Sequence, residues 1–326
     1  MMNDVFTPSA FTLSSLTAQI NNLVYAPMRL SGLFEESGIA TTSAAIDIED
    51  GVLSLVDVAP RGANGKPVTG PGRRAVPFLI PHLPERASLM ADEVQGVRAF
   101  GQESTAEILT NRIAERLTQM RRNIDYTLES HRLAALMGNY IDANGNSVSL
   151  FTTFSVSQQN LSFALGTTTT KIRSKCLTTL GYIENALDGT PFTGVRALCG
   201  GTFFDNLITH TNVEATYLNQ QMANELRTGD PRQVLNFGGI VFERYRGTSA
   251  VKVGDNDAYA YPEGVPGLMI TRFAPANYVE TVNTIGLPYY AKSEPMDFGK
   301  GYSIEAQSNP LNLVTRPAAV VKLTVS

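Results

Sequence analysis

The longest regular pattern of apolar positions falls between residues 104 and 137 and predicts one long amphipathic helix. From Ile113 onward the apolar positions recur every three or four residues, which keeps them on one helical face. Ser104 and Glu107 fit a capping box at the start, and Gly138 fits the stop. Such a helix would be roughly 50 Å long. A coiled coil is the alternative interpretation, although the pattern covers few heptads.

A second pattern, over residues 52–83, predicts a long β-hairpin. Residues 52–58 and 75–80 are rich in β-branched and apolar residues, and the segment between them is dense in glycine and proline, which end strands. Pro77 cannot donate a ladder hydrogen bond, so the returning strand belongs at an edge. A long two-stranded ribbon is only marginally stable alone. It therefore needs another surface to lie on.

The rest of the chain predicts a mixed half without regular alternation. A short hairpin turns at Asn144-Gly145, and a second helix is expected at about residues 171–187, with Cys176 facing inward. Residues 151–170 are rich in Ser, Thr and Gln and are interpreted as a surface connection. Residues 195–326 alternate short strands and short helices, ending in a β-branched strand. The fold class is therefore α+β.

The composition of the chain narrows the classes of protein that the sequence can encode. The chain has 326 residues, 43% hydrophobic and 17% charged, which excludes disorder as its main state. The charged share is below the usual value of about 25%, as expected of a chain that covers part of its surface with other chains. The net charge of −4 argues against a dedicated nucleic-acid-binding protein. The sequence contains no apolar run of transmembrane length, and its two cysteines fit a reducing cytosol.

Charge is unevenly placed along the first hundred residues. Residues 1–60 carry seven acidic residues against the single base Arg29, whereas residues 61–98 carry six bases against three acids. An acidic arm followed by a basic segment could pair within one chain. It could equally pair between neighbouring chains, where opposite charge guides encounter and register. For any single residue, ordinary solvated charge is the alternative.

No constellation of catalytic or metal-binding residues is found. The nucleophile elbow and the zinc helix motif are absent, and the three histidines are scattered. Residues 62–66 lack the spacing of a phosphate-binding loop. Residues 142–146 lack the glycine position and the final glutamate of a calcium loop, so a plain turn explains them better. We expect no enzyme activity, no metal and no cofactor.

Four segments in a fixed order carry a family resemblance. They are residues 124–142, where a Glu, an Arg and an Ala-Leu-x-Gly run precede the short hairpin, then 261–268 with 274–276, then 280–292, and finally 304–311. Together with the order of elements, they resemble the HK97-like major capsid proteins of tailed bacteriophages, in particular the family of the phage lambda major head protein. The resemblance covers about residues 20–326.

The resemblance implies an HK97-like capsid fold with five parts. These are an N-terminal arm (1–50), an extended loop hairpin (51–98), a peripheral domain with the spine helix at 104–137 (99–190), an axial domain (191–305), and a C-terminal strand returning to the peripheral domain (306–326).

It also implies a structural protein of the virion. Hexamers and pentamers would self-assemble in the bacterial host cytoplasm into an icosahedral shell around double-stranded DNA, bound without sequence specificity. A portal, a scaffold or protease and a decoration protein are the further partners implied; no membrane is involved. The alternatives are an encapsulin-like nanocompartment shell and a cytosolic α+β enzyme. The candidate inter-subunit contacts are Arg61, Lys66, Arg73, Arg74, Glu35, Glu36, Asp47, Glu49 and Asp50.

Overall fold

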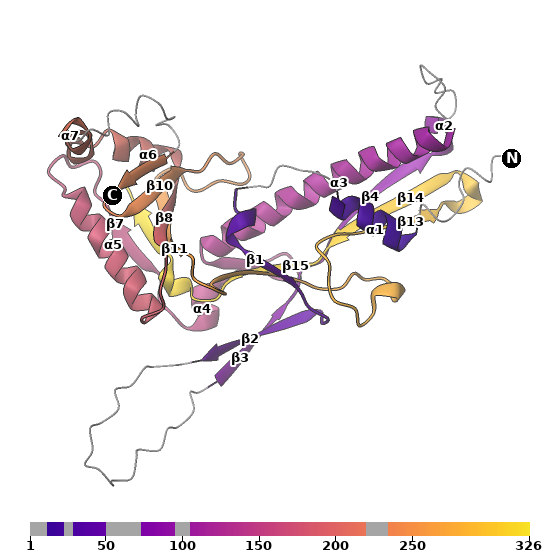
Figure 1. Ribbon diagram of the computed structural model, residues 1–326, viewed down its shortest axis with the longest axis horizontal. Helices are drawn as coiled ribbons and strands as arrows, with labels where there is room; N and C mark the ends of the chain where they lie inside the picture. The colour runs from indigo at the N-terminus through magenta and orange to yellow at the C-terminus, as the bar shows by residue number, and fades with distance from the viewer. Residues whose placement is uncertain (1–11, 23–28, 50–72, 95–104, 220–233) are drawn as a thin grey trace, which may run out of the picture.

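A computed structural model describes residues 12–22, 29–49, 73–94, 105–219 and 234–326. The molecule is elongated (Figure 1). A six-stranded sheet with its helices lies at one end, a long helix on a three-stranded sheet extends to the other, and a small central sheet lies between them.

The long helix is α3, Thr105–Leu136, which confirms the predicted spine helix to within one residue at each end. Its apolar face is buried, and the helix ends where the periodicity ends. Gly138 follows in the left-handed conformation with φ 89°, and a Cβ there would lie 2.0 Å from the Phe151 ring. Only glycine fits this stop. The buried apolar residues along the spine are Ile113, Leu117, Met120, Ile124, Leu128, Leu133 and Leu136.

The spine helix packs on an antiparallel sheet in the order β13-β14-β4. Helix α1 covers β13 and inserts Leu16 and Ile20, so that arm, sheet and spine share one apolar cluster. The elements are α1 Leu13–Asn22, β4 Leu83–Met90, α2 Ala91–Val94, β13 Tyr290–Pro295 and β14 Gly301–Ser308.

The opposite end is built on a six-stranded mixed sheet in the order β7-β16-β11-β8-β10-β9. Its helices are α5 Ile172–Leu187, α6 Gly201–Ile208 and α7 Thr211–Asn219. Its strands are β7 Gln159–Ser162, β8 Gly194–Cys199, β9 Val234–Phe237, β10 Ile240–Arg244, β11 Asp257–Glu263 and β16 Val321–Thr324. Helix α5 and the fully buried Cys176 confirm the predicted second helix and its inward cysteine.

The ends are joined by the sheet β1-β12-β15, in which the arm strand β1 pairs in parallel with β12. The strands are β1 Glu35–Gly38, β12 Met269–Phe273 and β15 Pro310–Val314. Short 3-10 turns lie at Ser31–Leu33, Val279–Thr281, Asp297–Gly299 and Pro317–Ala319. The predicted hairpin at Asn144-Gly145 is confirmed as β5 Asn139–Ile141 and β6 Ser147–Ser149.

Two local predictions need correction. The returning strand predicted at 75–80 is β3, Arg73–Leu79, and it pairs with β2, Ser43–Glu49. The strand predicted at 52–58 lies outside the described residues. Residues 151–170 are not a surface connection, because α4 (Leu150–Phe154) and β7 lie there and Phe163 is fully buried. The prediction was wrong because the segment is rich in Ser and Thr, while its few apolar side chains are buried in the core.

Candidate interaction surfaces

The described side chains hold no catalytic or metal-binding group. No cluster of three or more His, Cys, Asp or Glu residues suited to a metal ion occurs among them. His82 pairs with Asn309, whereas His210 lies elsewhere against the Thr167 carbonyl. Burial raises the pKa of Cys176 to about 12, so the thiol stays protonated and unreactive. Asp142 accepts three hydrogen bonds from Asn144 and Asn146, which confirms a plain turn.

Two consecutive arm residues fasten the arm to the six-stranded sheet and to the spine helix. Arg29 forms a two-pronged ion pair with Glu243 on β10, with one Nη2–Oε2 distance of 2.6 Å. The Leu30 amide donates to both Oε atoms of Glu129 on the spine helix at 3.2 Å each. A single peptide step therefore links the six-stranded sheet to the spine.

Glu129 lies in a buried site where its hydrogen-bond donors are uncharged. It is 3% exposed and also accepts a 2.9 Å hydrogen bond from the Tyr245 hydroxyl. Burial raises its pKa, and the donors from Tyr245 and Leu30 only partly oppose that shift. One turn earlier, Asp125 accepts from the Tyr289 hydroxyl, and burial raises its pKa too.

Glu243 lies in the opposite kind of site. Burial alone would raise its pKa, but hydrogen bonds and charge from Arg29 and Arg196 outweigh that effect and lower it. Arg196 donates to Glu243 at 2.9 Å and to Glu263 at 2.6 Å, so the guanidinium groups and carboxylates alternate along the sheet. The carboxylate is therefore stabilised in its charged form.

The predicted contact residues fall into three groups. Glu35 and Glu36 lie on β1, where Glu36 pairs with the buried Arg132 of the spine at 2.5 Å, and Glu35 lies 3.8 Å from Arg272. The register of the β2–β3 ribbon places Glu49 opposite Arg73. In the same ribbon Arg74 is opposite Ile48 and Asp47 is opposite Ala75. Arg61, Lys66 and Asp50 lie outside the described residues.

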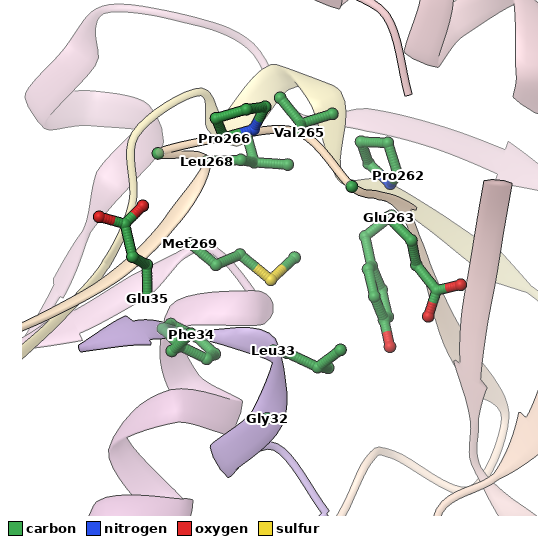
Figure 2. Close-up of a pocket in the computed structure, with 13 residues that line it drawn as sticks. Gly32, Leu33, Phe34, Glu35, Pro262, Glu263, Val265, Pro266, Leu268 and Met269 are labelled. Atoms are coloured by element: carbon green, nitrogen blue, oxygen red, sulfur yellow. The ribbon is translucent and has the colours of Figure 1, made fainter. Parts of the chain in front are cut away.

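A groove of about 510 Å³ lies between the start of the arm strand and the loop that joins β11 to β12. Its walls are largely apolar, and Figure 2 shows Glu35 and Glu263 flanking the apolar side chains on opposite sides. Gly264 and Gly267 bend the loop with φ values of 76° and 67°, a conformation that favours glycine. The apolar lining residues are Leu33, Phe34, Val265, Pro266, Leu268 and Met269. We call this the arm groove.

Highly exposed, large apolar side chains also lie in two segments of the C-terminal half of the chain. The segment 279–287 exposes Val279 and Ile285 by 88% and 70%. The turn between β13 and β14 exposes Phe298 by 94%. Neither segment was selected from the sequence as an exposed surface. The sequence feature that could have indicated the exposed turn between β13 and β14 is Phe298 directly before Gly299.

The fold has its counterparts among phage capsids. The capsid protein of cyanophage P-SCSP1u superposes with a TM-score of 0.53 at 12% identity, over 93% of this chain and 90% of that chain. The architecture is therefore the HK97-like fold, as the sequence predicted.

Similarity in sequence narrows this class. The chain is 27% identical over 354 residues to the major capsid protein of Salmonella phage Felix O1, covering 96% of each protein. It is 27% identical over 321 residues to the major capsid protein of Pseudomonas phage KPP10, covering 89% of this chain and 91% of the relative. Residues 12–325 match the family described as phage major capsid protein E.

The chain belongs to the phage major capsid protein E family. It is a structural, shell-forming head protein and a component of the virion. The enzyme alternative is thereby excluded. None of the described helices is long and apolar enough to cross a membrane. The narrower placement in the phage lambda family stays a prediction.

Proposed function

We propose that this chain forms hexamers and pentamers that close into an icosahedral shell around double-stranded DNA. The observation that carries the proposal is the family match over residues 12–325 together with the HK97-like fold. Identical subunits with head-to-tail contacts close into rings when their rotation permits closure. Each contact can be weak, because a subunit that engages many neighbours gains from high effective concentration.

The charge of the chain supports double-stranded DNA as the contents. A strongly basic shell would hold DNA by releasing its counterions and would oppose both packing and ejection. This chain has a net charge of −4, with 30 acidic and 26 basic residues. DNA would be enclosed without sequence-specific contacts. Assembly would take place in the host cytoplasm with a portal, a scaffold or protease and a decoration protein as partners.

The β2–β3 ribbon is the proposed reaching element of the subunit. It projects from the body of the molecule in Figure 1, and a two-stranded ribbon of this kind gains stability by lying on a neighbour. The bases of this region, Arg61, Lys66, Arg73 and Arg74, would face acidic groups of an adjacent subunit. The proposed acidic partners are Glu35, Glu36, Asp47, Glu49 and Asp50. Because Glu36 already pairs with Arg132, it is the weakest of these candidates.

Charge reversal in the ribbon tests that contact. We expect the double variant R73E/R74E to stay folded and to form few closed shells, whereas the control K252E, at an exposed site with a partner 3.7 Å away, should assemble normally. Normal shells from the ribbon variant would contradict the contact.

Electron microscopy of the negatively stained protein, combined with sedimentation velocity, tests the shell itself. Closed shells or six-fold and five-fold rings are expected, with shells of megadalton mass. A monomer or dimer that persists at high concentration and with phage assembly factors would overturn the proposal. Nuclease-protected DNA inside shells from infected cells is expected, whereas an enclosed enzyme would favour the nanocompartment.

A further inference from the structure

The turn between β13 and β14 presents a single aromatic side chain to solvent. Phe298 is 94% exposed, more than any other large apolar side chain among the described residues. The turn is ordered by two backbone hydrogen bonds, from Met296 to Gly301 and from Gly299 to Met296. Lys300 extends its ammonium group to 5.6 Å from the centre of the Phe298 ring. We call residues 297–300 the hairpin tip.

The backbone at Phe298 makes this exposure unusual. Its φ of 63° and ψ of 15° lie in the left-handed region, which glycine adopts without strain and a bulky side chain adopts at a cost. Glycine at this position would remove both the strain and the exposed apolar surface. Residues held in strained backbone conformations cluster at functional sites. The exposed Phe298 ring is therefore of the kind that becomes buried when two molecules associate.

The arm groove offers the chemistry that such an anchor fits. Its walls are apolar, and Glu35 stands at its edge with a side chain that is 59% exposed and 3.8 Å from its arginine neighbour. Tyr261 also lines the groove, and its hydroxyl is buried without a hydrogen-bond partner in the described structure. Buried hydroxyl groups normally have a partner. An aromatic ring with a nearby cation and a backbone acceptor would complement all three features.

The groove and the tip of one molecule cannot meet. Figure 1 shows the β13–β14 hairpin ending near α2, at the far end of the spine from the six-stranded sheet, whereas β1 and β11 frame the groove near the middle of the molecule. We propose that the hairpin tip of one copy inserts Phe298 into the arm groove of a second copy, with Lys300 facing Glu35. The contact is head-to-tail, the kind that builds rings and closed shells. This inference rests on the proposed function.

The segment 279–287 is the competing candidate for this contact. Its exposed side chains are aliphatic, and its charged group Glu280 is already paired with Lys292 at 3.0 Å. It therefore brings no free cation to the acidic edge of the groove. Val279, 88% exposed, supplies a matched control for the loss of one exposed apolar side chain.

Substitution of Phe298 should affect assembly without destabilising the folded subunit. In F298G the strain is relieved, so we expect an unchanged or higher melting temperature of the subunit but a critical concentration for assembly raised about tenfold or more. F298Y keeps the ring and should assemble nearly normally, and the control V279S should change the critical concentration less than twofold, roughly. Wild-type assembly by F298G, or an equal defect in V279S, would overturn the inference.

Disulfide trapping tests the geometry directly. Cys176 and Cys199 are fully buried, so the cysteines introduced at the exposed position 298 and the half-buried position 265 are the reactive ones. In shells of the double variant F298C/V265C, assembled above its raised critical concentration, oxidation should give a ladder of linked chains on a non-reducing gel, whereas V279C/V265C should stay monomeric. Linkage through position 279 and not 298 would overturn the inference.

The same samples separate this contact from the proposed function. Shells that form without a link between positions 298 and 265 would refute the contact and leave the function standing. If the wild-type protein forms no shells under any of the conditions above, both proposals fail together.

Discussion

Glu129 and Glu243 bind consecutive residues of the same arm, but the pKa values of these two buried carboxyl groups shift in opposite directions. Glu243 meets two guanidinium groups, from Arg29 and Arg196, and its pKa is lowered. Glu129 meets an amide and a hydroxyl group, and its pKa is raised by burial. The charge of a buried carboxyl group thus depends on its partners more than on its depth.

The largest effect is expected at the charged site. The variant E243A should lower the free energy of unfolding by about 3 kcal/mol, since it leaves two guanidinium groups without their shared carboxylate. Urea denaturation at pH 7 measures the change. The control D255A removes an exposed carboxylate whose partner is 3.7 Å away, and should cost less than about 0.5 kcal/mol. Equal losses would show that Glu243 contributes only surface charge.

Substitution of Glu129 should have a smaller effect on stability. E129A leaves the Leu30 amide and the Tyr245 hydroxyl without their acceptor, and should cost about 2 kcal/mol. The matched control on the same helix is E115A, whose side chain is 65% exposed and pairs with Arg112. A loss no greater than that of the control would mean that Glu129 does not fasten the arm.

Removing one donor should have a smaller effect again. Y245F deletes the 2.9 Å hydrogen bond to Glu129 and should cost about 1 kcal/mol. Because this hydrogen bond lowers the Glu129 pKa, its loss should also raise that pKa further. Thermal unfolding of the variant and the wild type at pH 7 gives the first value. A more stable variant would contradict the assignment.

The two sites should have opposite pH dependence, which is the smallest effect and the sharpest comparison. Since the Glu129 pKa is raised on folding, its contribution to stability is full below its ordinary pKa of about 4.3 and is lost as the pH rises through the folded value. Since the Glu243 pKa is lowered, its contribution is present above about 4.3 and is lost as the pH falls through the folded value.

The wild type should therefore gain stability relative to E129Q between pH 7 and pH 4. It should lose stability relative to E243Q below about pH 4. Denaturation midpoints of the three proteins across this range give both differences. Parallel pH profiles would remove the distinction between the sites.

Local signals in the sequence predicted much of the fold. Interactions between residues close in sequence determine the spine helix, its end at Gly138 and the turn at Asn144-Gly145. These features could therefore be predicted from the sequence alone. The strand at 43–49 was missed because its pairing with 73–79 depends on a partner beyond a long intervening segment.

The contacts of the candidate surfaces could not be read in the same way. Glu129 was noticed as part of a motif, but its partners Leu30 and Tyr245 lie 99 and 116 residues away. The arm groove likewise joins two segments separated by more than two hundred positions. The family resemblance placed the function correctly, while the side chains that could carry it required the three-dimensional arrangement.

The strand β1 has a consequence for the order in which the chain is made. Its partner β12 begins at Met269, and β4 likewise pairs with β14, which begins at Gly301. At the usual rate of protein synthesis, a ribosome needs roughly 10 to 40 seconds to extend the chain from β4 to β14. Until then neither the arm nor the peripheral sheet can close. A nascent subunit therefore lacks the arm groove and the hairpin tip until β12 and β14 have been made, and a growing shell can bind those surfaces only after that moment.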